Sequence, residues 1–355
     1  MSLTASFLSL AMHKIILLLT CLVSLSPGHP VRRAVQPLQR IPVAVDHEEQ
    51  RAKSIFDPSK ALAELLLVFD PAAAFFSAPP PVPKVIILDA DGTLLNNAHK
   101  LTPRVENAVR KAQAAGITVI PATGRARAGP WVDEVLDPLF EGSCQGVFLQ
   151  GLIVCDDVQC LLDKRLAPKI GRRVEEVCKE MGTILTSYCY DKLYYPAGFE
   201  EDDRILRYAS LGEAQPEPLE GSKLASAYAN ANKLLVLASE EELPALRPRL
   251  ERALRWRPAR VVKALDWTLE VLPRGSNKGY GVRKLLRGLE VPPRSVMAVG
   301  DGENDIEMMK LVGCPVAMGN AAPALKRICR HQVATNEEDG VAEAIERALN
   351  GDFSK

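Results

Sequence analysis

The chain of 355 residues lacks an excess of charge of either sign, and this absence limits its partners. It carries 44 basic and 44 acidic residues, so its formal net charge at neutral pH is zero, and no basic block stands out. Proteins that bind the nucleic-acid backbone usually show such an excess. The sequence therefore argues against nucleic acid as the main partner. A small anionic ligand remains compatible, because local charge is enough to bind it.

Cysteine and histidine patterns typical of other kinds of site are also missing. The eight cysteines are scattered, with neither a CxxC pair nor a histidine at zinc-ligand spacing. We therefore expect no disulfide framework and no structural zinc. None of the five histidines adjoins the acidic motifs described next, which disfavours a phosphohistidine enzyme or a histidine-based hydrolase.

Two carboxylates, one residue apart, follow a short apolar segment, Val85 to Leu88. Side chains alternate along a strand, but the turn at Gly92 can swing Asp91 back toward the cavity that Asp89 faces. One carboxylate can then attack phosphorus, while the second, held protonated by crowded anionic surroundings, protonates the leaving oxygen. We interpret Asp89 as the nucleophile and Asp91 as the acid/base. Taken alone, the segment fits an ordinary strand exit or a calcium loop equally well.

Three further fragments follow in order, and each borders an apolar segment. A hydroxyl and free backbone N–H groups can hold phosphate oxygens at the first, a lysine adds positive charge at the second, and an acidic turn can bind a cation at the third. Together they could neutralise a transferring phosphoryl group. The fragments are Thr123-Gly124-Arg125, Gly275-Ser276-Asn277-Lys278-Gly279 and Gly300-Asp301-Gly302-Glu303-Asn304-Asp305.

In this order the four motifs resemble those of the haloacid dehalogenase superfamily, and the later sequence resembles its Cof-type branch, which carries a subclass IIB cap. The match covers roughly residues 83 to 350. Around Gln150, where most Cof-type proteins have asparagine, the sequence resembles plastid-directed plant and algal members. The resemblance implies a Mg²⁺ site and a phosphate site. Its metal ligands are Asp89 and Asp301 through their side chains and Asp91 through its backbone carbonyl. Thr123, Gly124, Lys278 and Asn304 bind phosphate, and Asp305 supports these groups. Arg125 is expected beside them, where it could contact substrate or cap its loop.

The expected fold is α/β, a doubly wound parallel sheet with an inserted smaller α/β cap of the C2 type. Strand and helix patterns alternate around the motifs, and ligands of such sheets bind beyond the carboxyl ends of the strands. A first helix is expected from the N-cap Thr102 through the stripe Val105, Ala108, Val109 and Ala112 to Gly116. We expect a third core strand near 147–149. The long interval between Arg125 and Lys278 places the cap at 169–268 and the catalytic core at 84–168 and 269–355.

The first 45 residues contain no aspartate or glutamate, and their apolar run from Ile15 to Leu25 is short for a membrane span. We expect a targeting leader at 1–45, with a signal-like segment and a transit peptide, and no membrane span in the mature protein. A plastid destination is favoured, with the secretory pathway as the alternative; a disordered tail around a chance apolar patch also fits. Residues 46–83 are expected to be a linker, rich in proline and alanine at its end.

The function favoured by these patterns is a Mg²⁺-dependent phosphatase that acts on a small phosphorylated metabolite, such as a sugar phosphate or a phosphorylated cofactor precursor. A phosphomutase of the same fold and a catalytically silent module that senses a metabolite are the alternatives. Dehalogenation is disfavoured, because the dehalogenases of the family lack the second aspartate of the first motif. The sequence leaves the natural substrate, the residues of the cap that select it and the oligomeric state open.

Overall fold

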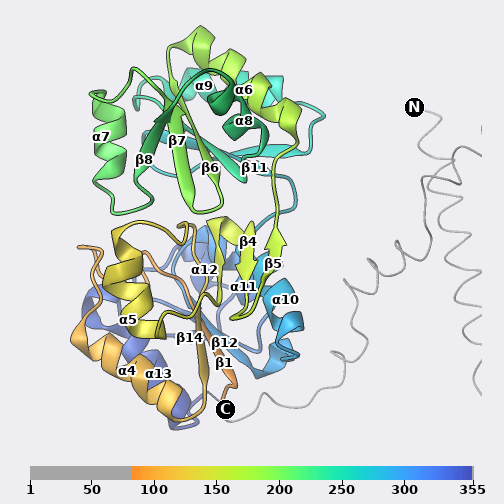
Figure 1. Cartoon of the computed structure of the whole chain (residues 1–355). Helices are drawn as coiled ribbons and strands as arrows, with labels where there is room; N and C mark the ends of the chain where they lie inside the picture. Colours follow the sequence, from red (N-terminus) through yellow and green to blue (C-terminus); the bar gives the residue numbers. More distant parts are fainter. Residues whose placement is uncertain (1–81, 354–355) are drawn as a thin grey trace, which may run out of the picture. The chain divides into compact units, whose positions relative to one another are not determined.

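The computed structural model describes residues 82–353, so the expected leader and most of the expected linker lie outside the described part of the chain. Within it, a parallel sheet and a separate mixed sheet each carry their own helices (Figure 1). The expected α/β class is confirmed. Among the described helices, none has both the length and the apolar character needed to cross a bilayer.

The core sheet has five strands, all parallel, in the order β14-β13-β12-β1-β2. Its central strands are almost wholly buried, which explains their continuous apolar sequences. Helix α4 packs against α13, and α10 against α11. The elements of this part are β1 (Val85–Leu88), α4 (Pro103–Ala114), β2 (Thr118–Pro121), α5 (Asp137–Phe140), α10 (Lys278–Gly288), β12 (Val296–Gly300), α11 (Ile306–Met309), β13 (Cys314–Ala317), α12 (Pro323–Lys326), β14 (His331–Gln332) and α13 (Gly340–Leu349).

The first helix forms as expected. The side chain of Thr102 accepts a hydrogen bond from the backbone N–H of Val105, and Pro103 opens the helix. The buried residues of α4 are those of the expected stripe, and Gly116, at φ +80°, follows the helix end. Local capping and periodicity were therefore enough to predict this element.

The expected third core strand takes another form. Strand β3 (Gly146–Phe148) belongs to a small antiparallel sheet with β4 (Ile153–Cys155) and β5 (Cys160–Asp163). Its link to the core sheet is a single parallel bridge between Ala122 and Val147. The reason is that the backbone turns directly after Phe148, with positive φ at Leu149 and Gln150, so the strand cannot continue beside β2.

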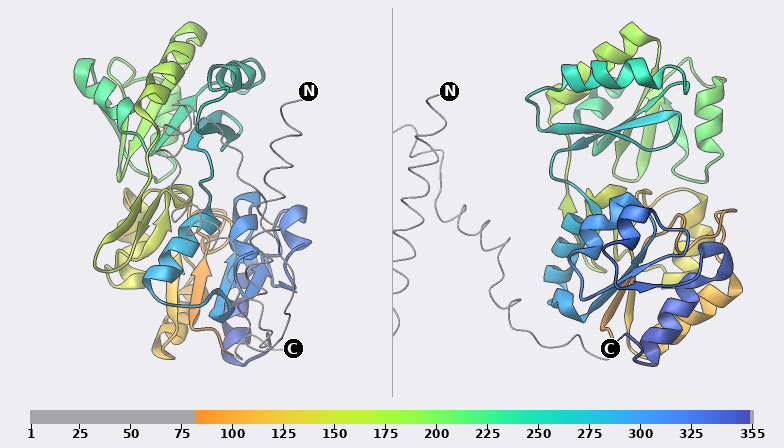
Figure 2. Two further views of the ribbon diagram at one scale, coloured as in Figure 1. Left: turned by 90° about the vertical axis from the view of Figure 1, so that its right-hand side faces the viewer. Right: turned by 180° about the vertical axis from the view of Figure 1, so that it is seen from behind.

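The second sheet has six strands in the order β10-β11-β9-β6-β7-β8, antiparallel except for the β7–β8 pair. Helices α8 and α9 each pack against α6. Figure 2 shows this sheet and its helices from two further sides. Its elements are α6 (Pro168–Met181), β6 (Ile184–Cys189), β7 (Lys192–Pro196), α7 (Asp203–Ala209), β8 (Pro216–Leu219), α8 (Gly221–Ala229), β9 (Lys233–Leu237), α9 (Leu243–Ala253), β10 (Ala259–Lys263) and β11 (Thr268–Pro273).

The two faces of the second sheet have different roles. Along β9, Leu234 and Val236 join the apolar cluster beneath α6 and α9, whereas Lys233 and Leu235 line a cavity on the other face. The same alternation holds along β11. The expected boundary at residue 268 falls on the first residue of β11, all of which pairs within this sheet. We propose that the cap spans residues 168–273.

Candidate active site

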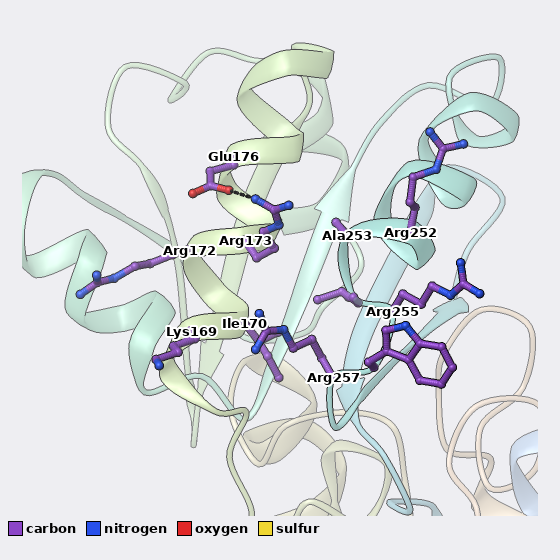
Figure 3. Close-up of a pocket in the computed structure, with 11 residues that line it drawn as sticks. Lys169, Ile170, Arg172, Arg173, Glu176, Arg252, Ala253, Arg255 and Arg257 are labelled. Atoms are coloured by element: carbon purple, nitrogen blue, oxygen red, sulfur yellow. Dashed lines mark hydrogen bonds and ion pairs between the residues drawn. The ribbon is translucent and has the colours of Figure 1, made fainter. Parts of the chain in front are cut away.

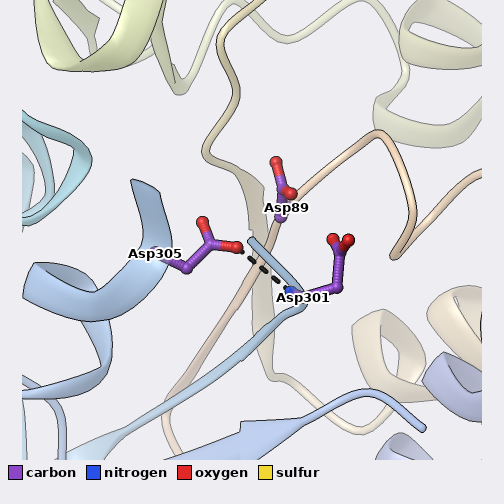
Figure 4. A group of neighbouring side chains, drawn as sticks. All are labelled: Asp89, Asp301 and Asp305. Atoms are coloured by element: carbon purple, nitrogen blue, oxygen red, sulfur yellow. Dashed lines mark hydrogen bonds between the residues drawn. The ribbon is translucent and has the colours of Figure 1, made fainter. Parts of the chain in front are cut away.

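The carboxyl ends of neighbouring parallel strands bring the acidic motifs together. Leu88 of β1 lies in register with Val299 of β12, so Asp89 and Asp301 leave the sheet side by side. Carboxylate oxygens of Asp89, Asp301 and Asp305 all lie within 4.8 Å of one another (Figure 4). Thr123 follows β2, the neighbouring strand on the other side of β1. The structure thus gathers three of the predicted site residues into one cluster and places a fourth beside it.

Lys278 supplies the positive charge of the cluster. It is the first residue of α10, whose N-cap Asn277 accepts a hydrogen bond from the backbone N–H of Tyr280 at 2.7 Å. Its ammonium donates to Asp89 Oδ1 at 2.5 Å and to Asp305 Oδ1 at 2.8 Å, and its side chain is fully buried. Burial acts to lower the pKa of Lys278, but the two carboxylates outweigh it and raise that pKa.

The carboxyl of Asp89 is shielded from water. Burial raises its pKa well above the ordinary value, and the nearby carboxylate of Asp305 adds to the effect, while Lys278 opposes it. Burial also raises the pKa of Asp301. Because desolvation and like charges both disfavour the charged forms, a cation placed between Asp89 and Asp301 would be strongly attracted.

Asp305 uses both of its oxygens within the protein. Oδ1 accepts from Lys278, and Oδ2 accepts from the backbone N–H groups of Asp301 at 3.1 Å and of Gly302 at 3.0 Å. These bonds hold the turn that carries Asp301. The oxygens available to a cation therefore belong to Asp89 and Asp301. The Oδ1 atom of Asp89 accepts from Lys278, and the Oδ1 atom of Asp301 accepts from Thr93.

Gly92 explains part of the first motif. Its φ is +75°, a conformation that glycine adopts easily, and a Cβ atom built on it would lie 2.4 Å from Asp301 Oδ2. The next residue, Thr93, donates its hydroxyl proton to Asp301 Oδ1 at 2.8 Å. The Gly-Thr pair therefore makes room for the second carboxylate and orients it, a role for Thr93 that the sequence did not indicate.

Asp91 lies in surroundings opposite to those expected. Arg125 donates to it twice, from Nε at 2.8 Å and from a terminal nitrogen at 2.5 Å, and His99 Nδ1 lies 3.1 Å from its Oδ1. Burial acts to raise the pKa of Asp91, but the hydrogen bonds and charge of Arg125 outweigh it, so the pKa is lowered. The expectation that anionic neighbours hold Asp91 protonated is wrong, because its closest neighbours are basic. Sequence reasoning also missed His99, which no motif includes.

Of the remaining predicted residues, Gly124 and Asn304 line the cavity described below, whereas Thr123 does not. Thr123 is fully buried, and its hydroxyl accepts a hydrogen bond from the backbone N–H of Arg125 at 3.1 Å. A Cβ on Gly124 would lie 2.7 Å from Gln150 Nε2, so the loop passes close to that side chain. Asn304 donates to Gln150 Oε1 at 3.2 Å. Gln150 thus joins two predicted loops, although no role was predicted for it.

A cavity of about 880 Å³ lies over these residues, and both sheets contribute to its lining. The core side includes Asp89, Asp91 and Asp301, and the cap side includes polar groups from β9, β10 and β11. Lys233 on β9 forms a buried ion pair with Glu270 on β11 at 2.5 Å, and its ammonium lies 3.4 Å from the carbonyl oxygen of Gly124. This contact links the cap directly to the Thr123-Gly124 loop.

A second acidic group of the cap reaches the cavity. Glu213 accepts hydrogen bonds from the hydroxyls of Tyr188 at 2.8 Å and Tyr208 at 3.2 Å. Nothing in the local sequence marked Glu213, Lys233 or Glu270, because their proximity to the core motifs depends on how the cap sheet folds.

The donor chemistry of the cluster fits a magnesium ion. Mg²⁺ prefers hard oxygen ligands and needs few from the protein, because it retains water and binds substrate phosphate. Asp89 and Asp301 offer carboxylate oxygens, with no sulfur or imidazole donor in the described cluster. When bound there, such an ion would polarise a phosphoryl oxygen and neutralise its charge.

Comparisons with known proteins agree with this geometry. The family model of the haloacid dehalogenase-like hydrolases matches residues 86–345. A chloroplastic endoribonuclease YBEY of Arabidopsis thaliana is 31% identical over 74% of this chain, but the match spans only 46% of that protein. Phosphatase YwpJ of Bacillus subtilis is 29% identical over 75% of this chain and 100% of its own length.

Solved structures show the same fold. A haloacid dehalogenase-like hydrolase from Bacteroides thetaiotaomicron is similar with a TM-score of 0.67 and 26% identity, over 75% of this chain and 99% of that one. The subclass IIB sugar phosphatase BT4131 shares the fold, with a TM-score of 0.61 and 20% identity, over 74% of this chain and 98% of its own. The chain therefore belongs to the haloacid dehalogenase-like hydrolases, and it shares the fold of a subclass IIB member.

Proposed function

We propose that this protein is a Mg²⁺-dependent phosphatase of small phosphomonoesters. The observation that carries the proposal is the convergence of Asp89, Asp301 and the buried ammonium of Lys278 at the cavity. A nucleophile, an oxygen site for a divalent cation and a fixed positive charge are the parts that phosphoryl transfer requires. Several relatives are named as phosphatases, among them YwpJ and an HMP-PP phosphatase of Yersinia pseudotuberculosis.

In the proposed reaction, a carboxylate oxygen of Asp89 forms a bond to phosphorus while the bond from phosphorus to the ester oxygen breaks. The leaving oxygen takes a proton from Asp91. Water then attacks the aspartyl-phosphate, gives a proton to Asp91, and releases phosphate and the free carboxylate of Asp89. Thr123, Gly124, Lys278 and Asn304 hold the phosphoryl oxygens. Asp89, Asp301 and the backbone carbonyl of Asp91 would hold Mg²⁺, which would supply positive charge to the transferring group.

The pairing of Asp91 with Arg125 favours the role of Asp91 as a base over its role as an acid. Because Arg125 lowers the pKa of Asp91, the carboxylate is ionised at neutral pH in the observed geometry, which is the form that accepts a proton from water. To protonate the leaving oxygen, Asp91 must first take up a proton, which the ion pair opposes. We therefore expect Arg125 to affect the first step and the second step differently.

The cap wall of the cavity indicates the class of substrate. It presents the charged pair of Lys233 and Glu270 and the carboxylate of Glu213, together with Arg260. Such groups favour a leaving group rich in hydroxyls or amines over an apolar one, because a buried polar group without a partner is costly. This supports a sugar phosphate or a phosphorylated cofactor precursor. A Bacillus subtilis relative that matches 32% of this chain is named 5-amino-6-(5-phospho-D-ribitylamino)uracil phosphatase.

The test is a panel of phosphomonoesters assayed for phosphate release with Mg²⁺ and with EDTA. We expect metal-dependent release from the wild type, and none above background from Asp89→Asn, although its thermal unfolding remains cooperative. Normal turnover by Asp89→Asn would refute the assignment of the nucleophile. Conversion of hexose phosphates to isomers without phosphate release would favour the phosphomutase. Tight binding of one ester without any turnover by the wild type would favour the sensing module.

We also propose a plastid location, directed by residues 1–45. The support is the acid-free, basic composition of this segment and the chloroplastic name of the Arabidopsis relative. A fluorescent protein fused behind residues 1–83 should accumulate in plastids of a plant or algal cell. Accumulation in the endoplasmic reticulum would favour the secretory alternative.

A further inference from the structure

A second concave site lies on the cap, away from the acidic cluster. It is a groove of about 640 Å³ between the first turns of α6 and the segment that ends α9, and none of its lining residues lines the 880 Å³ cavity. Of its lining residues, six are basic and one, Glu176, is acidic (Figure 3). We call it the basic groove, and its basic residues are Lys169, Arg172, Arg173, Arg252, Arg255 and Arg257.

Most of this charge is uncompensated. Arg173 pairs with Glu176 at 2.8 Å, but none of the other five basic residues forms an ion pair with any carboxylate of the described residues. The whole chain has a formal net charge of zero, so the positive charge is concentrated here and is offset elsewhere. Like charges held close together create a positive potential that attracts anions from solution.

The groove also has an exposed aromatic side chain. Trp256 is 85% exposed, whereas Trp131 and Trp267 are each 4% exposed. Its backbone has φ +65°, which is uncommon for a residue with a large side chain. The guanidinium of Arg255 lies 5.2 Å from the centre of the indole ring. Exposing the apolar surface of an indole to water is unfavourable. Beside arginines without ion-pair partners, the ring offers a flat surface on which a planar group can stack.

These features select among anionic ligands. Arginine, which supplies five of the six cations, presents a planar fork that binds phosphate through two hydrogen bonds. An exposed indole stacks on nucleobases. Inorganic phosphate would use the cations but leave Trp256 without a role. A flat membrane surface could not enter a concave groove, whose volume is within the range of small-molecule sites, about 300–1,000 Å³.

We propose that the basic groove binds a nucleotide, with its phosphate on the arginines and its base stacked on Trp256. A free nucleotide and a nucleotide unit of single-stranded RNA both provide this chemistry. The site lies outside the proposed catalytic cluster, so the proposal does not depend on phosphatase activity.

The test follows the fluorescence of Trp256 in the full chain during titration with ATP and, separately, with a short oligoadenylate, both in EDTA. Stacking on the exposed indole should quench its emission, and the two buried tryptophans should contribute little change. Trp256→Ala should weaken binding, followed by calorimetry, by about 10-fold or more. The double variant Arg255→Ala/Arg257→Ala should also weaken it at least about 10-fold, because it removes two phosphate donors.

The matched control is Arg247→Ala. Arg247 also lies on α9, but outside the groove and in an ion pair with Glu251 at 2.8 Å, so its loss should leave the affinity unchanged. If only ATP binds, the result supports the proposal and identifies a free nucleotide as the ligand. If only the oligoadenylate binds, with a steep dependence on salt, the result supports the proposal and identifies single-stranded RNA as the source.

Three outcomes would overturn the proposal. The first is that neither ligand binds. The second is that binding is equal in the wild type, Trp256→Ala and the double arginine variant, which would place it elsewhere. The third is that inorganic pyrophosphate, or vesicles of phosphatidylglycerol, bind as tightly as the nucleotides and independently of Trp256, which would exclude a role for the base.

Discussion

The fully buried ammonium of Lys278 allows a direct test of the electrostatics of the site. It donates to Asp89 at 2.5 Å and to Asp305 at 2.8 Å. Methionine has a similar volume but no charge, so Lys278→Met leaves two buried carboxylates without their cation. Removing one partner of a buried ion pair costs about 3–5 kcal/mol. We therefore expect the free energy of unfolding to fall by that amount and Tm to fall by roughly 6–20 °C.

The matched control is Lys310→Met. Lys310 pairs with Glu307 at 3.1 Å, but both side chains are about half exposed, and such surface pairs contribute about 0–1 kcal/mol. Urea denaturation and thermal scans of both variants, without Mg²⁺, give the comparison. Adding Asp305→Asn to Lys278→Met should recover part of the lost stability, because it removes one of the uncompensated carboxylates.

The outcome also bears on catalysis. If Lys278→Met were no less stable than Lys310→Met, the buried carboxylates would not depend on the lysine for their charge, and the electrostatic account of the cluster would be refuted. If Lys278→Met remained folded at the assay temperature but released no phosphate, the ammonium would have a role in turnover apart from its role in folding. Measuring both properties on the same variants therefore separates the two roles of Lys278.

Three further predictions concern the metal, the first motif and the thiols. Mg²⁺ at 100 times its Kd should stabilise the wild type by about 2.7 kcal/mol, which differential scanning fluorimetry would detect as a rise in Tm. Asp301→Asn should abolish this rise in Tm. An unchanged rise would place the ion elsewhere. Gly92→Ala should abolish turnover, because its Cβ would lie 2.4 Å from Asp301 Oδ2, whereas Gly116→Ala, also at positive φ but with open space around it, should retain it; equal activities would contradict the packing argument. Mass spectrometry after alkylation should find the exposed Cys160 modified before Cys178, whose pKa burial raises to about 12, and the reverse order would refute the burial of Cys178.

The sequence predicted those features that depend on short segments. Each acidic motif follows an apolar strand, and parallel strands carry their carboxyl ends to the same edge, so the meeting of Asp89 and Asp301 follows from pattern and topology alone. Helix α4 was predictable for a similar reason, because its cap, its first proline and its buried stripe all lie within fifteen residues.

Side-chain pairings that the order and alternation of the strands do not imply could not be predicted. The pairing of Asp91 with Arg125 joins residues 34 positions apart and reverses the expected charge environment of Asp91. The ion pair of Lys233 and Glu270 requires β9 and β11 to be neighbours in the sheet, although β10 lies between them in the sequence. A single sequence contains no signal for such neighbours beyond the alternation along each strand.

The basic groove shows why a balanced composition is weak grounds for excluding an anionic partner. Net charge sums over the chain, whereas a ligand responds to the potential within about 10 Å of its own position at moderate salt. A local signal was present in the sequence, where Arg252, Arg255 and Arg257 lie within six residues around Trp256. Three arginines beside one tryptophan usually form only a solvated surface. Here α6 brings Lys169 and Arg172 to the same groove, and this convergence turns a short basic segment into a candidate binding site.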